Sequence, residues 1–462
     1  MKIVFKRTNM GAALLGAFCC MCILFLITLY HDGGALHPES SLFFTAYLDG
    51  RSLLQKVFDP QRNDWGCYQA RELSYFFDFL DAHVVAFLLK KQIIWFHSFT
   101  SLIFCGIMVF IQQYFTRKFF PAVPGTLVTV LSLFFVLAAP VSGLDYFRSA
   151  KYLSALGIWG AFFSGYAVFR WNTLRSRLCF LLSLLLMTLS DRQGFFFTAV
   201  FSGTAAVVML YQSLKNAPVA SFRMKFVTLA PLGVLIFGIL NNLYITPLLV
   251  RSVNGYAPDF AFQREISVKM EHLLQGFYFF FGNGGNWFNN FTGEYVTASI
   301  TGILLLGGIA LELLRQHLKG CRRAVPLALC WGCGIIAMYI CSVIMVARLD
   351  IIMKSDLFFG VYTITFLAFI LALVIFTAAG AGKRFCVILL VFFSLAAVLR
   401  LGMELAGDRF IPEWSVEDNC KMRQHVLKKA LKDPGYDFKK QCMPYRMELF
   451  LKFYRERVLT KQ

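Results

Sequence analysis

The sequence predicts an all-α polytopic membrane protein, and two observations lead to this fold class. First, 58% of its 462 residues are hydrophobic and only 15% are charged, with a mean hydropathy of +0.62. A water-soluble chain of this size could not cover so much apolar surface. Second, apolar runs recur along the whole chain, and the loops between them alternate between basic and acidic composition.

Each expected transmembrane helix is an apolar run of about twenty residues, the length that crosses the hydrocarbon core of a bilayer. The runs lie near residues 10–29, 92–114, 124–142, 151–169, 177–190, 195–212, 226–249, 295–314, 325–347, 357–379 and 384–400. The sequence therefore predicts about eleven helices. No small-residue cleavage site follows the first run, so we expect a retained span and not a removed signal peptide.

The charges of the loops predict the orientation. Alternate loops are short, basic and almost free of acids, with Arg117, Lys118, Arg170, Arg175, Arg177, Lys215, Arg223, Lys225, Arg315, Lys319, Arg322, Arg323, Lys383 and Arg384. The opposite loops carry nearly all the Asp and Glu. Because Lys and Arg accumulate on the cytoplasmic side, the amino terminus is expected inside and the carboxyl terminus outside. The net charge of +19 is assigned to these loops, and no nucleic-acid partner is expected.

Residues 1–405 are expected to form the transmembrane domain, and residues 406–462 a helical extracytoplasmic tail. Two outer loops, 30–91 and 250–294, are too long to be simple connectors, and loops of that length usually carry function. Within the first loop, the apolar segment 73–89 is interrupted by acids and a histidine. This pattern is typical of an amphipathic helix that lies in the membrane interface.

Cysteine usage indicates neither a metal site nor redox chemistry. Most of the 13 cysteines lie inside apolar runs, where they act as small hydrophobic residues. Cys420 and Cys442 are the only two in the tail, and a disulfide between them is reasonable in an oxidising compartment. The chain has no metal-ligand spacing, P-loop, GxGxxG or GxSxG motif. The sequence does not identify a cofactor, because a divalent cation is compatible with it but not required by it.

The candidate catalytic residues are two acids in the first outer loop, Asp64 and Glu72. Asp64 has two interpretations. In the first it acts in the site, either as a base that deprotonates an acceptor hydroxyl or as a ligand of a cation. In the second it is a turn residue. Glu72 follows Arg71, and adjacent helical residues point in different directions, so Glu72 needs another partner or a substrate. Asp78 and Asp81 share one helix face, which either extends the site or is a solvated polar face.

Arginines on the outer side are the candidate phosphate ligands, because the planar guanidinium matches a phosphate. They are Arg71, Arg148, Arg192, Arg251, Arg264 and Arg348. Asp191 and Arg192 lie in a very short loop, so both are expected near the membrane surface. The alternative interpretation of each arginine is structural pairing with a loop acid.

The second long outer loop contains aromatic rings, amides and glycines between Phe277 and Asn290. Asn286 and Trp287 are the candidate substrate-binding residues of this loop, because an aromatic ring can stack on a sugar ring and an amide can form a hydrogen bond to it. The alternative is an aromatic belt followed by a turn.

In its expected layout the chain resembles the GT-C superfamily of membrane glycosyltransferases. The shared features are the orientation, a long first outer loop with acids and interfacial helices, and an outer carboxyl-terminal part. The family's signature is a pair of acids in the first loop. Its nearest equivalents here, Asp64 and Glu72, are more widely separated, and Asp64 followed by Arg71 and a hydrophobic helix is similar to the oligosaccharyltransferase catalytic subunit. The tail lacks a Trp-Trp-Asp-type motif.

The resemblance implies an inverting hexosyl or pentosyl transfer from a polyprenyl-phosphate-type lipid donor to a glycan, lipid or protein acceptor. It places the reaction on the extracytoplasmic face of a bacterial inner membrane. Asp64 or Glu72 would take the acceptor's proton, and arginines would stabilise the departing lipid phosphate. Two alternatives remain: an O-antigen polymerase or ligase-like enzyme, and a transporter.

Overall fold

The computed structural model describes most of the helical part of the chain. The described residues are 7–30, 51–58, 70–91, 93, 95, 97–138, 149–191, 194–195, 197–200, 203, 222–256, 268–278, 295–319, 336, 339–340, 343–344, 356–405, 429, 433 and 435. Within these residues the regular structure is entirely helical, as the composition predicts.

The helices follow one another in the order α1 (Arg7–Tyr30), α3 (Leu53–Val57), α4 (Glu72–Lys90), α5 (Phe99–Phe119), α6 (Gly125–Ala138), α8 (Ser149–Arg170) and α9 (Leu174–Ser190). The second half comprises α11 (Phe222–Leu240), the π-helix η2 (Asn241–Ile245), α12 (Thr246–Asn254), α13 (Met270–Tyr278), α14 (Tyr295–Leu318), α16 (Asp356–Gly380) and α17 (Lys383–Leu405).

Five segments among the described residues are long and apolar enough to cross a membrane, which indicates a membrane protein. They are Met10–Leu29, Phe99–Phe119, Ser149–Arg170, Leu229–Asn254 and Lys383–Gly402. Shorter apolar helices occupy Gly125–Ala138 and Ile364–Gly380. The expected runs at 195–212 and 325–347 lie mostly outside the described residues.

One expected boundary is wrong. The second run was expected from residue 92, but α5 begins at Phe99. Ser98 is its N-cap, and the Ser98 side chain accepts a hydrogen bond from the backbone N–H of Ser101. A serine cap starts a helix more effectively than apolar composition does, because it satisfies a backbone donor that has no partner within the helix.

The core forms around α8, whose Trp159 and Phe162 side chains are fully buried. Glycines let α8 approach α9 closely: a Cβ on Gly160 would lie 2.3 Å from Ser183 Oγ, and one on Gly157 would lie 2.4 Å from Met187 Cγ. Small residues at such contacts are typical of helix packing in membranes.

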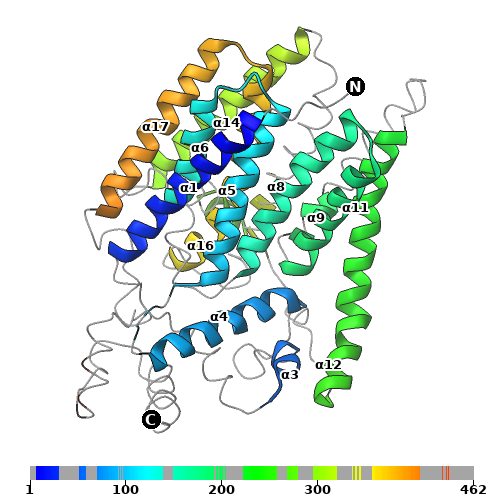
Figure 1. The fold of residues 1–462 in the computed structure, drawn as a ribbon. Helices are drawn as coiled ribbons and strands as arrows, with labels where there is room; N and C mark the ends of the chain where they lie inside the picture. The colour runs from blue at the N-terminus through cyan, green and yellow to red at the C-terminus, as the bar shows by residue number, and fades with distance from the viewer. Residues whose placement is uncertain are drawn as a thin grey trace.

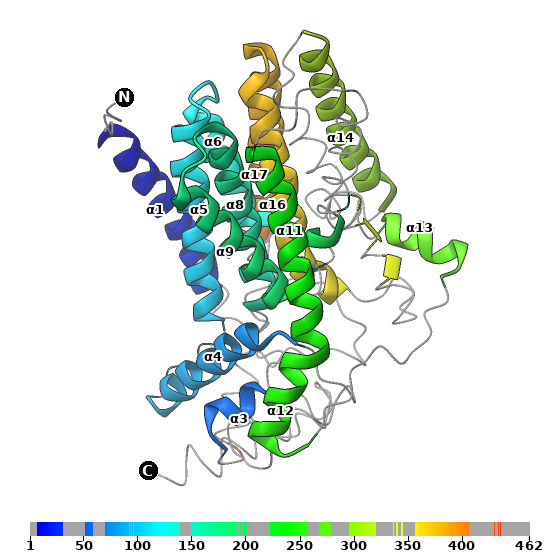
Figure 2. The ribbon, with the colours of Figure 1, turned by 90° about the vertical axis from the view of Figure 1, so that its right-hand side faces the viewer.

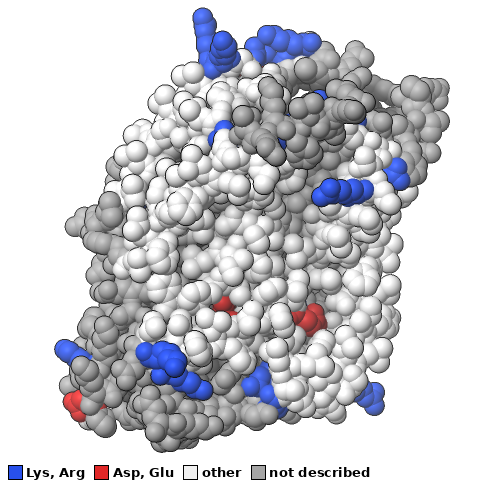
Figure 3. Space-filling model, viewed as in Figure 1, with Lys and Arg blue, Asp and Glu red and all other residues white. Residues whose placement is uncertain are grey.

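The long helices run side by side, and α4 lies across one end of them (Figure 1). The rod formed by α11, η2 and α12 continues past the other helices to the level of α4 and α3 (Figure 2). We call this side of the molecule the α4 end. The face drawn in Figure 3 has a broad band with few charges: Lys and Arg gather toward its two ends and two acidic spots lie in its lower part, as expected for a protein surrounded by lipid.

Candidate functional site

The candidate site at the α4 end begins with Arg71 and Glu72, at the start of α4. Arg71 is the N-cap residue and Glu72 the first helical residue, in the turn where an acidic side chain interacts favourably with the helix dipole. Arg71 Nε donates a hydrogen bond to Tyr75 Oη at 3.0 Å, and its guanidinium carbon lies 5.3 Å from the centre of that ring. Tyr75 is buried, so Arg71 is held against a fixed aromatic surface.

Glu72 links the start of α4 to the start of α12. Thr246 Oγ1 donates a hydrogen bond to Glu72 Oε1 at 2.9 Å. Thr246 is buried and directly follows the π-helix η2. A π-turn changes the direction in which later side chains point, and π-turns often occur at functional sites. A second contact supports this arrangement: Asn254 Nδ2 donates to the carbonyl oxygen of Gln55 at 3.2 Å.

Asp78 does not form a solvated face with Asp81, and that expectation is wrong. Asp78 is 1% exposed. Its Oδ1 accepts the backbone N–H of Ser149, the first residue of α8, at 2.9 Å, and its Oδ2 accepts the Ser74 hydroxyl at 3.3 Å. The physical reason is that the first N–H groups of a helix have no partner within that helix. A carboxylate supplies the missing acceptor for α8.

Asp81 serves α5 in the same way and is fully buried. Its Oδ1 accepts the backbone N–H of Thr100 at 2.9 Å. Its Oδ2 accepts the hydroxyls of Thr100 at 2.6 Å and Ser98 at 2.5 Å. Burial raises the pKa of Asp81 to about 6, while these hydrogen bonds act in the opposite direction. The exposed residues of α4 are the apolar Phe76, Leu80 and Phe87, together with Lys90 at its end.

Asp191 is the C-cap residue of α9 and forms a buried ion pair with Lys151 of α8. The two side chains are 4% and 6% exposed, respectively. We expected Asp191 near a membrane surface beside Arg192, but did not single out Lys151. A lysine at the start of an apolar run was the available signal, because a buried charge needs a partner of opposite sign. The pair brings the acidic end of α9 to the first turn of α8.

The other predicted residues of the site, Asp64, Arg148, Arg192, Asn286 and Trp287, lie outside the described residues. So do Arg264 and Arg348, and so do the cysteines of the tail. Arg251 is exposed on α12. Within the described part of the chain, no group of three His, Cys, Asp or Glu residues could hold a metal ion.

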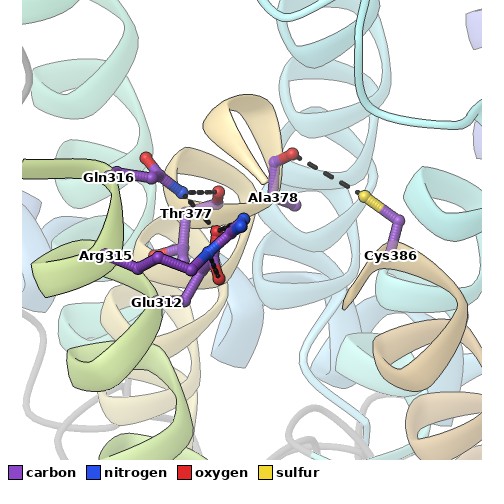
Figure 4. Close-up of polar contacts among 6 residues, drawn as sticks. All are labelled: Glu312, Arg315, Gln316, Thr377, Ala378 and Cys386. Carbon is purple, nitrogen blue, oxygen red and sulfur yellow. Dashed lines mark hydrogen bonds and ion pairs between the residues drawn. The ribbon is translucent and has the colours of Figure 1, made fainter. Parts of the chain in front are cut away.

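A second polar cluster joins α14 to α16 away from α4 (Figure 4). Glu312 accepts two hydrogen bonds from Arg315, both at 2.7 Å, and one from Gln316 at 3.2 Å. Gln316 Nε2 also donates to the carbonyl oxygen of Thr377 at 2.9 Å. A Cβ on Gly380 would lie 2.2 Å from Gln316 Oε1, so this glycine makes room for the amide. We interpret the cluster as a structural contact that holds α14 against α16.

No protein-family model, no curated protein and no solved structure matches the chain.

Proposed function

We propose that this protein is a membrane glycosyltransferase that moves a sugar from a polyprenyl-phosphate-type lipid donor to an acceptor on the extracytoplasmic face of a bacterial inner membrane. The observation that carries the proposal is the contact between Glu72 and Thr246. It joins the acidic segment of the first long outer loop to the helix that enters the second. Both loops were expected to carry function, and the contact supports a shared site.

The proposed chemistry uses the acids, arginines and loop residues predicted from the sequence, of which Arg71 and Glu72 lie at the start of α4. Asp64 or Glu72 takes the proton of an acceptor hydroxyl as its oxygen attacks the anomeric carbon of the sugar. The bond from that carbon to the phosphate oxygen breaks, and the lipid phosphate leaves with the bonding electrons. Arg71, Arg148 and Arg192 stabilise the negative charge on the leaving phosphate. Asn286 and Trp287 contact the sugar.

The proposed topology has about eleven transmembrane helices, the amino terminus inside and the α4 end outside. The basic last turns of α5 and α8 support this orientation. These turns contain Arg117, Lys118 and Arg170, and both helices start at α4 and run away from it.

Reporter fusions test the topology. A reporter fused after Gln462 should be active in the extracytoplasmic compartment, and one fused at Asn216 in the cytoplasm, because basic loops stay inside. Either fusion reporting the opposite compartment would remove the basis for an outer site.

Replacement of the two candidate bases tests the chemistry. Membranes containing the protein are supplied with radiolabelled polyprenyl-phosphate sugars and with envelope glycan, lipid or protein acceptors. Glu72→Gln or Asp64→Asn should lower transfer by about 10²–10⁴-fold, the range typical for loss of a general base. Asp433→Asn is the matched control, because Asp433 is an exposed acid outside both long outer loops. Full transfer by both amide variants would refute the mechanism.

A further inference from the structure

We propose that Asp78 and Asp81 are positioning residues, which hold α4 against the N-termini of α8 and α5 and thereby set the place of Arg71 and Glu72 beside Thr246. The geometric part of this inference is independent of any activity. Its effect on sugar transfer rests on the proposed function.

One face of α4 binds two different helices. Asp78 and Asp81 are three residues apart and therefore share a face. Asp78 accepts the first backbone N–H of α8, and Asp81 accepts a backbone N–H in the first turn of α5. The first residue of α8 makes a further contact, since Ser149 Oγ donates to the carbonyl oxygen of Ser74 at 3.0 Å. Two attachment points prevent α4 from turning about either one.

Burial makes these contacts between α4 and the two helix N-termini necessary. Both carboxyl groups are almost completely buried. Moving α4 away would leave helix N–H groups without acceptors next to apolar surroundings, which is unfavourable. Hydrogen bonds to a carboxylate are also roughly twice as strong as those between neutral groups. The docked position of α4 is therefore well defined.

The docked position of α4 affects the position of Glu72 in the candidate site. Glu72 precedes Asp78 by six residues, about 9 Å along one helix at a rise of 1.5 Å per residue. On its other side Glu72 accepts a hydrogen bond from Thr246, which is buried at the start of α12. The attachment of α4 to α8 and α5 therefore helps to place Glu72 at this contact.

A crosslinking experiment tests the geometry. The pair Glu72→Cys and Thr246→Cys is introduced with the exposed Cys19 and Cys179 replaced by Ala. A short thiol-reactive crosslinker is applied, and the 72–246 product is measured by mass spectrometry. Because both members of the Glu72–Thr246 hydrogen bond are replaced, the proximity of the two thiols reports the docking of α4.

Asp78→Ala or Asp81→Ala should lower the crosslinking yield about tenfold, the change that corresponds to loss of one helix cap. Asn at either position should restore it, because its side-chain oxygen still accepts the backbone N–H. The control pair Gln55→Cys and Asn254→Cys, which joins α3 to α12, should crosslink equally in all variants. Unchanged 72–246 crosslinking in both Ala variants would overturn the proposal.

A second variant keeps the test valid if the Ala proteins do not fold. Ser149→Pro removes the N–H that Asp78 accepts, at the first helical position where proline is tolerated. Ser149→Ala keeps that N–H and is the matched control. Ser149→Pro should lower the 72–246 crosslinking more than Ser149→Ala does, and equal yields would contradict the role of Asp78.

Sugar transfer separates this inference from the proposed function. In the protein without introduced cysteines, Asp81→Ala should lower kcat more than it raises the KM for the lipid donor, because a misplaced base slows the chemical step. Asp81→Asn should restore kcat. Normal kcat in a variant with lost crosslinking would overturn the positioning role. Absence of transfer in the unmodified protein would refute the proposed function, while the crosslinking result would still decide the docking of α4.

Discussion

Replacement of Asp81 by Asn should abolish a specific part of the pH dependence of stability. The pKa of Asp81 rises from its ordinary value of 3.8 to about 6 because the carboxyl is buried. The folded protein therefore binds this proton more tightly than the unfolded chain does. Asp81 therefore adds to the free energy of unfolding at low pH. This contribution is complete below pH 4 and is lost as the pH rises through 6.

The size of the effect follows from the shift. A rise of the pKa from 3.8 to about 6 corresponds to at most about 3 kcal/mol. Asp81→Asn cannot take up the proton. On going from pH 8 to pH 4, its free energy of unfolding should therefore lack the gain, of up to that amount, that Asp81 gives the unmodified protein. The other carboxyl groups titrate in both proteins, and the difference between the two curves isolates Asp81.

Unfolding by SDS in mixed micelles, measured at a series of pH values, provides the assay. Glu271→Gln is the control for replacing an acid by its amide, because Glu271 is exposed on α13. Parallel curves for the unmodified protein and Asp81→Asn from pH 8 to pH 4 would refute the reasoning, because they would mean that burial does not raise the pKa of Asp81.

Two further predictions concern the packing of α8. Lys151→Ala should lower the free energy of unfolding by about 3–5 kcal/mol, because Asp191 would be left as a buried unpaired charge. The double variant Lys151→Met and Asp191→Leu should recover most of this loss in the same SDS assay, and an equally unstable double variant would contradict the explanation. Gly157→Ala should cost about 1–3 kcal/mol through overpacking against α9. Gly233→Ala, where a Cβ meets nothing within 4 Å, should be close to neutral, and equal losses at the two positions would show that α8 and α9 are not closely packed.

Local sequence patterns predicted the class of the protein and most described helices. Composition alone indicated a membrane protein, because apolar surface on this scale requires lipid. The runs at 10–29, 151–169 and 384–400 correspond closely to α1, α8 and α17. The segment 73–89 was correctly predicted as a helix, now α4. These predictions succeed because hydrophobic length and periodicity are properties of contiguous residues.

The direction in which α4 faces was decided by tertiary structure. In sequence, acids on one side of a short apolar helix indicate contact with water. In the structure Asp78 and Asp81 point into the protein, while Phe76 and Leu80 are exposed. The deciding factor is the unmet hydrogen-bonding need at the N-termini of two other helices, α5, which follows α4 in the chain, and α8, whose first residue is 71 residues from Asp78.

The same limit explains what was missed in the candidate site. The partners Glu72 and Thr246 are 174 residues apart, and Lys151 and Asp191 are 40 apart. No local pattern encodes either distance. Composition and local pattern indicated which residues carry charge and roughly where the helices run. Only the packing of α4, α8, α9 and α12 decided which of these charges meet, because a buried polar group requires a partner that other parts of the chain must supply.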